Sequence, residues 1–214
     1  MGYRAFKRED LIEEVVPLLD GRELLLLRPR DTEELLDEAV FEDRDEFIPY
    51  WADLWPSAIL LARTLAGRSL RGARVLELGC GLGLPSLAAA QAGGRVLATD
   101  WAPDALEAVE LNAAHNEVAV ETLVSDWRAP GELLARGPFD LVIAADVLYE
   151  RRNVTPLTEL IERLDTVVWL ADPGRPPAAE MTGNLELAGW DVSTLAATDS
   201  PRVTVRRLEP GRMS

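Results

Sequence analysis

The chain has 214 residues, of which 48% are hydrophobic, and it carries 37 acidic against 22 basic residues, for a formal net charge of -15. This length predicts one medium-sized domain with an N-terminal extension, and the hydrophobic content suffices for a buried core. The acidic excess argues against nucleic acid and anionic membranes as partners, because both are bound through clustered Lys and Arg. It is compatible with a cationic substrate, although surface solvation explains the charge equally well.

The sequence also bears on location and on metal binding. Cys80 is the only cysteine, so no intrachain disulfide can form. The first residues carry acids and lack the apolar core of a signal peptide, and no apolar run approaches the ~20 residues of a membrane span. We therefore expect a cytoplasmic protein. His115 is the only histidine, which supports neither a zinc site nor a Ser-His-Asp triad, so we expect no metal.

The N-terminal part has an irregular pattern. Residues 3–20 mix charged and apolar side chains at loosely helical spacing, and residues 23–28 are typical of a short strand. Residues 31–46 are dense in acids and predict a solvated helix face or a loop. We therefore expect an extension over residues 1–48, with a helix, a short strand and an acidic segment. The main domain is expected over residues 49–214.

In the main domain, helical and strand patterns alternate. The pattern predicts helices at residues 57–65, 84–92, 103–115, 155–164 and 178–188. It predicts strands at residues 74–78, 95–100, 120–126, 139–146, 166–172, 190–196 and 202–208. The last two strands are joined by a short loop, so they should be antiparallel. The sequence therefore predicts an α/β fold with a doubly wound, mostly parallel seven-stranded sheet that ends in an antiparallel hairpin.

A glycine-rich turn follows the first strand of this series. Residues 79–83 read GCGLG and precede a helix, an arrangement that lets a ligand approach the backbone closely. Asp100 ends the next strand, where an acid can bind ribose hydroxyls. The dinucleotide pattern G-x-G-x-x-G is not met, because Leu84 stands where its third glycine would be. The turn alone is also compatible with a simple tight connection between strand and helix.

Acidic and indole side chains lie at the ends of four successive strands. A carboxylate within a strand, as at Glu77, is costly to bury unless it is paired. An acid beside an indole can accept a hydrogen bond from the amino group of adenine while the indole covers its ring. The sequence therefore predicts one pocket lined by Glu77, Asp100 with Trp101, Asp126 with Trp127, and Asp146.

These segments carry a resemblance. The run VLELGCGLGLPSLAAA, then VLATDWAPDALEAVELNAAHN, SDW and FDLVIAADVLYE resembles the seven-β-strand S-adenosylmethionine (SAM)-dependent methyltransferases. YWADLWPSA and DVLY resemble the protein-lysine methyltransferase group of that class. PYWA and DPGRP are similar to segments of the enzymes that methylate lysines of the electron transfer flavoprotein β subunit.

The resemblance implies SAM as cofactor and a role for each matching residue. It implies a D-x-x-Y motif at the methyl group, with Asp146 and Tyr149 as catalytic and substrate-binding residues and Trp51 as a further wall of the substrate site. It implies that the cofactor is bound by Trp55, Glu77, Gly79, Gly81, Asp100, Trp101, Asp126, Trp127 and Ala145.

The leading hypothesis from the sequence is SAM-dependent methylation of a lysine in a protein substrate. A small amine or heterocycle is the alternative acceptor, and an NAD-dependent oxidoreductase or a non-catalytic SAM-binding module are further alternatives. Asp146 could instead cap the turn after its strand, and Trp51 and Trp55 could be core residues. The loop DPGRPP at residues 172–177 could face the substrate or only be rigid.

Overall fold

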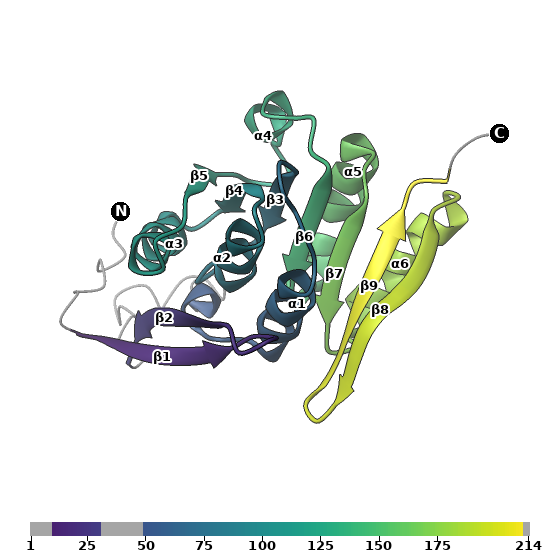
Figure 1. The fold of residues 1–214 in the computed structure, drawn as a ribbon. Coiled ribbons are helices and arrows are strands. Elements are labelled where there is room, and N and C mark those ends of the chain that lie inside the picture. Colours follow the sequence, from purple (N-terminus) through teal and green to yellow (C-terminus); the bar gives the residue numbers. More distant parts are fainter. Residues whose placement is uncertain (1–9, 31–48, 212–214) are drawn as a thin grey trace, which may run out of the picture.

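The computed structural model describes residues 10–30 and 49–211. Its centre is a seven-stranded sheet with the order β5-β4-β3-β6-β7-β9-β8 (Figure 1). The strands are β3 (Arg74–Leu78), β4 (Arg95–Asp100), β5 (Val120–Val124), β6 (Leu141–Ala145), β7 (Val168–Asp172), β8 (Asp191–Asp199) and β9 (Arg202–Glu209).

The strand directions confirm the predicted doubly wound sheet. The first five strands pair in parallel, whereas β9 pairs antiparallel with both β7 and β8. The chain runs outward from β3 to β5, returns to β6 beside β3, and then continues to the opposite edge. The change of direction between β3 and β6 creates a crevice at the carboxyl ends of these strands, where ligands bind in such folds.

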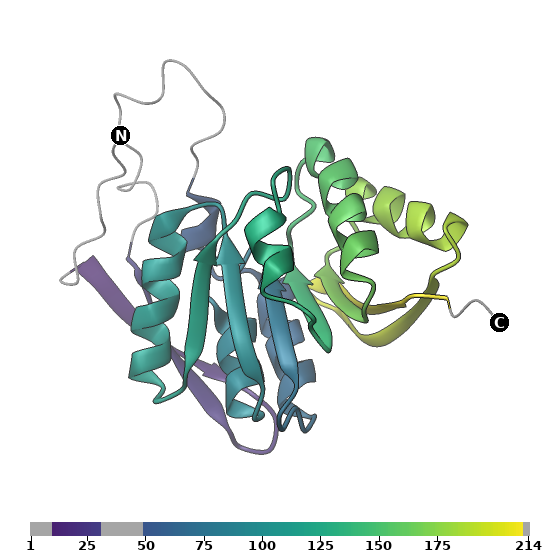
Figure 2. The same cartoon turned by 90° about the horizontal axis from the view of Figure 1, so that it is seen from above.

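Helices cover both faces of the sheet (Figures 1 and 2). They are α1 (Pro56–Ala66), α2 (Leu84–Gln91), α3 (Pro103–His115), α4 (Gly131–Ala135), α5 (Val154–Leu164) and α6 (Pro176–Leu187), with short 3-10 turns η4 (Tyr50–Ala52) and η5 (Arg151–Asn153). Alternate strand residues point to opposite faces, so Val75 and Ile143 pack with α1 and α2, while Leu76 and Val142 pack with α5 and α6. The parallel strand β6 is buried on both faces, as its apolar sequence predicts.

The N-terminal extension differs from the prediction. Leu11–Pro17 forms β1, an antiparallel partner of β2 (Glu23–Pro29), so the helix expected over residues 3–20 is wrong where the structure describes it. Val16 and Leu24 pack into the same apolar cluster as helices α1 and α2, which places the hairpin against their outer side (Figure 1). This tertiary contact favours a strand over a weakly periodic local pattern. The acidic segment 31–46 lies outside the described residues.

Candidate active site

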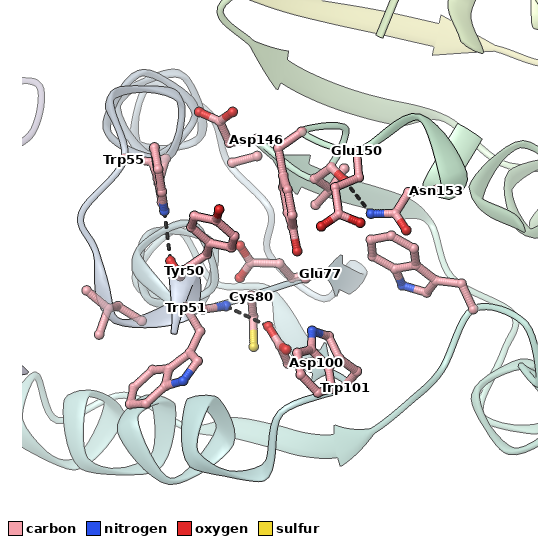
Figure 3. Close-up of a pocket in the computed structure, with 18 of the residues that line it drawn as sticks. Tyr50, Trp51, Trp55, Glu77, Cys80, Asp100, Trp101, Asp146, Glu150 and Asn153 are labelled. Carbon is pink, nitrogen blue, oxygen red and sulfur yellow. Dashed lines mark hydrogen bonds between the residues drawn. The ribbon is translucent and has the colours of Figure 1, made fainter. Parts of the chain in front are cut away.

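A cavity of about 620 Å³ opens at the carboxyl ends of the parallel strands. Figure 3 shows the carboxylates of Glu77, Asp100 and Glu150 around a common space, between Tyr50 with Trp55 and Trp101. The structure brings every site residue expected from the sequence to this one cavity: Trp51, Trp55, Glu77, Gly79, Gly81, Asp100, Trp101, Asp126, Trp127, Ala145, Asp146 and Tyr149.

Two glycines of the turn after β3 allow other segments to approach closely. Gly81 has φ of +50°, and a Cβ there would lie 3.0 Å from the carbonyl oxygen of Trp51. A Cβ at Gly79, which has φ of +64°, would lie 2.8 Å from Val147 Cγ1 and 3.5 Å from the Trp127 indole. Side chains are strained at these φ values and would collide with their neighbours. The turn is therefore shaped by its contacts with the aromatic segment and with the D-x-x-Y segment.

Glu77 is a buried carboxyl group in the floor of the cavity. Its Oε2 accepts a hydrogen bond from the backbone N–H of Ser86 at 2.9 Å and a second from the Ser86 hydroxyl. Ser86 lies in the first turn of α2, where backbone N–H groups are free to bind an acid. Burial nevertheless raises the pKa of Glu77 from its usual 4.5 to about 8. The protonated form therefore predominates at neutral pH unless a cation enters the cavity.

Asp100 ties the glycine turn to β4. Its Oδ2 accepts the backbone N–H of Gly81 and its Oδ1 accepts that of Ala102, both at 3.0 Å. Burial raises the pKa of this carboxyl above its usual range. A carboxylate offers about four lone-pair sites, so Asp100 keeps acceptor capacity for ligand hydroxyl groups.

Indoles flank the cavity next to these acids. Trp101 is 49% exposed at the edge of the cavity, and Trp127 is partly buried beside Gly79. Asp126 is bound by the guanidinium of Arg128, with Nη2 2.8 Å from its Oδ2. This hydrogen-bonded ion pair lowers the pKa of Asp126.

Asp146 follows β6 in the left-handed backbone region, with φ of +59°. Its Oδ2 accepts the hydroxyl of Ser57 at 2.9 Å and its Oδ1 accepts Nε of Arg175 at 2.8 Å. Asp146 therefore links the start of α1 to the loop before α6, and it already pairs with a cation. This arrangement differs from a simple cap of its own turn, because both partners are distant in sequence.

Three aromatic rings stand near the D-x-x-Y segment. The ring centroid of Tyr50 lies 5.1 Å from that of Tyr149 and 6.3 Å from that of Trp55. The backbone carbonyl of Tyr50 accepts a hydrogen bond from the indole N–H of Trp55 at 2.9 Å. Burial raises the pKa of Tyr149 to about 12, with a further contribution from Glu150. At neutral pH its side chain is therefore a neutral phenol that can donate a hydrogen bond.

Sequence reasoning missed several side chains of the site. Ser57 and Ser86 hold the two central carboxylates, and Tyr50 completes the aromatic group. Arg175 lies in the DPGRPP loop, whose place after the fifth predicted strand was a signal for a role in the site. Ser86 follows a glycine turn in a helical first turn, which was a weaker signal, and nothing in the sequence pointed to Ser57.

Comparison with known proteins supports one family. A family model described as lysine methyltransferase matches residues 42–168, more than half of the chain. The chain belongs to this family. This membership confirms the resemblance to the lysine methyltransferase group of the SAM-dependent methyltransferases.

Two relatives of this chain are themselves named as lysine methyltransferases. An electron transfer flavoprotein β subunit lysine methyltransferase of Xenopus laevis is 37% identical over 136 residues, which are 59% of this chain and 53% of that protein. A protein N-lysine methyltransferase METTL21A of Danio rerio is 35% identical over 130 residues, 56% of this chain and 59% of that protein. The chain thus spans little more than half the length of these relatives.

A third relative differs in its acceptor. A histone-arginine methyltransferase METTL23 of Xenopus laevis is 32% identical over 154 residues, 68% of this chain and 62% of that protein. Among solved structures, a T. thermophilus 16S rRNA N2 G1207 methyltransferase in complex with AdoMet and guanosine superposes with a TM-score of 0.64 at 17% identity. That match covers 94% of this chain and 50% of the other, and it supports the fold alone.

The chemistry of the cavity fits SAM. The buried carboxyls Glu77 and Asp100 offer acceptors for an ammonium group and for ribose hydroxyls, and the indoles of Trp101 and Trp127 offer flat apolar surface for adenine. The volume of about 620 Å³ lies within the roughly 300–1,000 Å³ usual for small-molecule sites. Over residues 10–30 and 49–211, no helix is long and apolar enough to cross a membrane, and no cluster of side chains is arranged to hold a metal ion.

Proposed function

We propose that this chain transfers a methyl group from SAM to the side-chain nitrogen of a lysine in a protein substrate. The observation that carries the proposal is the ion pair between Asp146 and Arg175 in the cavity wall, because it marks a place where a cation is bound beside the D-x-x-Y segment. The naming of relatives as lysine methyltransferases supports the same acceptor.

The cofactor-binding roles follow the position of each residue in the cavity. Glu77 is suited to bind the amino group of the cofactor, since an entering cation favours the ionised form of this carboxyl. Asp100 is suited to bind the ribose, with Trp101 and Trp127 against the adenine. Trp55, Gly79, Gly81, Asp126 and Ala145 are proposed as the remaining cofactor contacts because they line the same cavity.

Methyl transfer asks the protein for position rather than for a covalent nucleophile. SAM supplies an electrophilic methyl group on a sulfonium. The N–C bond forms as the C–S bond breaks, its electron pair passes to sulfur, and the acceptor nitrogen must have lost a proton. Asp146 is proposed to attract and orient the acceptor nitrogen, and Tyr149 to form a hydrogen bond with it. Trp51 and Tyr50 are proposed to line the part of the cavity that receives the acceptor side chain. Burial raises the pKa of Tyr149 to about 12, so we expect this phenol to donate a hydrogen bond rather than to act as the base at neutral pH.

The charge at the cavity favours a cationic acceptor. Six carboxyl side chains line it, against three guanidinium groups: Asp53, Glu77, Asp100, Asp126, Asp146 and Glu150 against Arg128, Arg152 and Arg175. Three of these acids form ion pairs with the three arginines, which leaves Asp53, Glu77 and Asp100. Burial raises the pKa values of Glu77 and Asp100, so these two carboxyls add full negative charge only when a cation enters and favours their ionised forms. Such a field concentrates cations near the opening.

A protein arginine is the second candidate acceptor. The relative named histone-arginine methyltransferase covers 68% of this chain, and the cation on Asp146 in this structure is itself a guanidinium. A small amine or heterocycle remains the third. A cytoplasmic location remains an expectation from the sequence.

The test is to incubate the purified chain with methyl-labelled SAM and a cell extract, and to separate proteins from small molecules. Label in protein bands is expected. Label confined to small molecules would overturn the protein acceptor, and a chain that binds neither SAM nor S-adenosylhomocysteine in calorimetry would overturn the cofactor as well.

A further inference from the structure

Asn112 makes hydrogen bonds to two segments that are distant in sequence. This side chain lies on α3 and is fully buried. Its Nδ2 donates to the carbonyl of Leu82 in the glycine turn and to the carbonyl of Leu27 in β2, both at 3.1 Å. Its Oδ1 accepts the backbone N–H of Leu27 at 2.7 Å. The side-chain amide of Asn112 therefore joins the glycine turn to the β1–β2 hairpin.

The orientation of this amide is determined by its partners. Both amide protons of Asn112 meet carbonyl oxygens and its oxygen meets an N–H, so a flipped amide would place like groups against each other. The bond to Leu82 is buried and the two bonds to Leu27 are partly buried, and a buried polar group that loses its partner is costly. Docking of β2 in this register therefore satisfies the amide proton and the oxygen that the bond to Leu82 leaves over, and it fixes the amide in the orientation that serves Leu82.

The turn contains few other restraints at this position. Asp100 holds Gly81 through its backbone N–H, and Gly83 donates its N–H to the carbonyl of Cys80. The Leu82 carbonyl lies between these two contacts and accepts from Asn112. Loss of that bond would leave a buried carbonyl without its donor, and the turn would shift next to the residues proposed to bind SAM.

The next turn of α3 supplies a matched comparison. Asn116 makes the same pair of bonds to β2, accepting the N–H of Leu25 at 2.9 Å and donating to its carbonyl at 2.7 Å. Its Nδ2 also donates to the carbonyl of Asn112 within the helix, at 2.8 Å. Both side chains therefore bind the hairpin. Of the two, only Asn112 also forms a hydrogen bond to the glycine turn.

We infer that Asn112 is a positioning residue that keeps the glycine turn in its cofactor-binding shape and couples it to docking of the β1–β2 hairpin. The inference rests on SAM as cofactor and is independent of which acceptor is methylated. Because such coupling is reciprocal, a bound cofactor should also stabilise the docked hairpin.

The experiment compares the full chain with N112L and N116L. Leu has the same branching at Cγ as Asn and is a better helix former, so both variants remove the hydrogen bonds and add similar volume. The dissociation constant of S-adenosylhomocysteine is expected to rise about tenfold or more in N112L and to change less than about threefold in N116L. Equal weakening in both variants would overturn the inference, because hairpin docking in general would then explain the effect.

A second measurement uses the unchanged protein. Amide hydrogen exchange at Leu25 and Leu27, followed by NMR, is expected to slow when S-adenosylhomocysteine binds, and the slowing should be lost in N112L. Bound S-adenosylhomocysteine with unchanged exchange in the wild-type chain would overturn the inference alone. A wild-type chain that binds no S-adenosylhomocysteine would overturn the proposed function together with it.

Discussion

Arg175 Nε lies 2.8 Å from Asp146 Oδ1, and the Ser57 hydroxyl lies 2.9 Å from Asp146 Oδ2. Both oxygens of the proposed acceptor-binding carboxylate are therefore engaged in this structure. Only the guanidinium is a cation, and it is the partner that a substrate ammonium would replace. Arg175 reaches Asp146 through a single nitrogen rather than through the two-nitrogen geometry that makes arginine pairs strongest. We therefore expect exchange of one cation for another on Asp146 when the acceptor enters.

The first prediction concerns Arg175. The R175Q variant removes the cation that competes for Asp146, so the KM for a protein acceptor should fall several-fold, while the dissociation constant of S-adenosylhomocysteine should stay within about twofold. R175K, which keeps a cation, should stay closer to wild type. R151Q is the control, because Arg151 pairs with Glu180 on the surface. A higher KM in R175Q would show instead that Arg175 helps to hold the acceptor.

The second prediction concerns Asp146. D146N keeps the shape and tolerates the left-handed backbone, which Asn adopts more readily than other residues. The loss of a charged hydrogen bond to the acceptor should lower kcat/KM roughly 10- to 100-fold, with S-adenosylhomocysteine binding preserved. D146A should also lower the melting temperature below that of D146N, since Ala at this φ is strained. Full activity in D146N would refute the role of Asp146.

The third prediction concerns the pH dependence of stability at Glu77. Its folded-state pKa of about 8 lies above its usual 4.5, so between these values the folded chain binds a proton that the unfolded chain releases. The stabilisation is complete below about pH 4.5 and is lost as the pH rises toward 8, by up to a few kcal/mol. Urea titrations at pH 5 to 8 measure it.

The control for this prediction is E77Q, whose amide oxygen can still accept from Ser86. Its free energy of unfolding should fall less with pH than that of the wild type. Some slope should remain, because burial also raises the pKa values of Asp100 and Asp172. Equal slopes in the two proteins would show that Glu77 is ionised in the folded chain throughout this range.

The fourth prediction concerns Tyr149. At neutral pH the Tyr149 side chain is a neutral phenol that offers one hydrogen bond and one aromatic surface to the acceptor. Y149F removes the hydrogen bond and should lower kcat/KM by roughly tenfold. Y149A removes the ring as well and should lower it further. The pH–rate profile of Y149F should keep the shape of the wild-type profile below about pH 10. A limb of the profile that disappears in Y149F within this range would show that the phenol titrates during turnover.

Much of the sheet was predictable because its strands are short apolar runs bounded by turn residues. The apolar run of β6 and the glycine turn after β3 placed the strand ends, and these placed Glu77, Asp100 and Asp146 on one cavity. Strand β1 was missed because Leu11–Pro17 alternates only weakly, and its conformation depends on pairing with β2. Strand β2 is in turn bound by Asn112 and Asn116 of α3.

The partners of the site residues were the harder part. Ser57 and Asp146 are 89 positions apart, and Arg175 and Asp146 are 29 apart. Nothing in the local sequence of Asp146 specifies that both reach it. Sequence reasoning could name the carboxylate but not the hydroxyl and the guanidinium that hold it, because those contacts arise only when α1 and α6 pack on opposite faces of the sheet.

The most direct test of the central claim is to identify the methylated amino acid. A K7R variant, which lacks the only lysine of the chain and so cannot methylate a lysine of its own, is incubated with methyl-labelled SAM and cell extract, beside K7R/D146N. Labelled proteins are then hydrolysed and analysed. Labelled methyl-lysine that is strongly reduced with D146N is the predicted result. Labelled methyl-arginine, or label absent from protein, would contradict a protein-lysine methyltransferase.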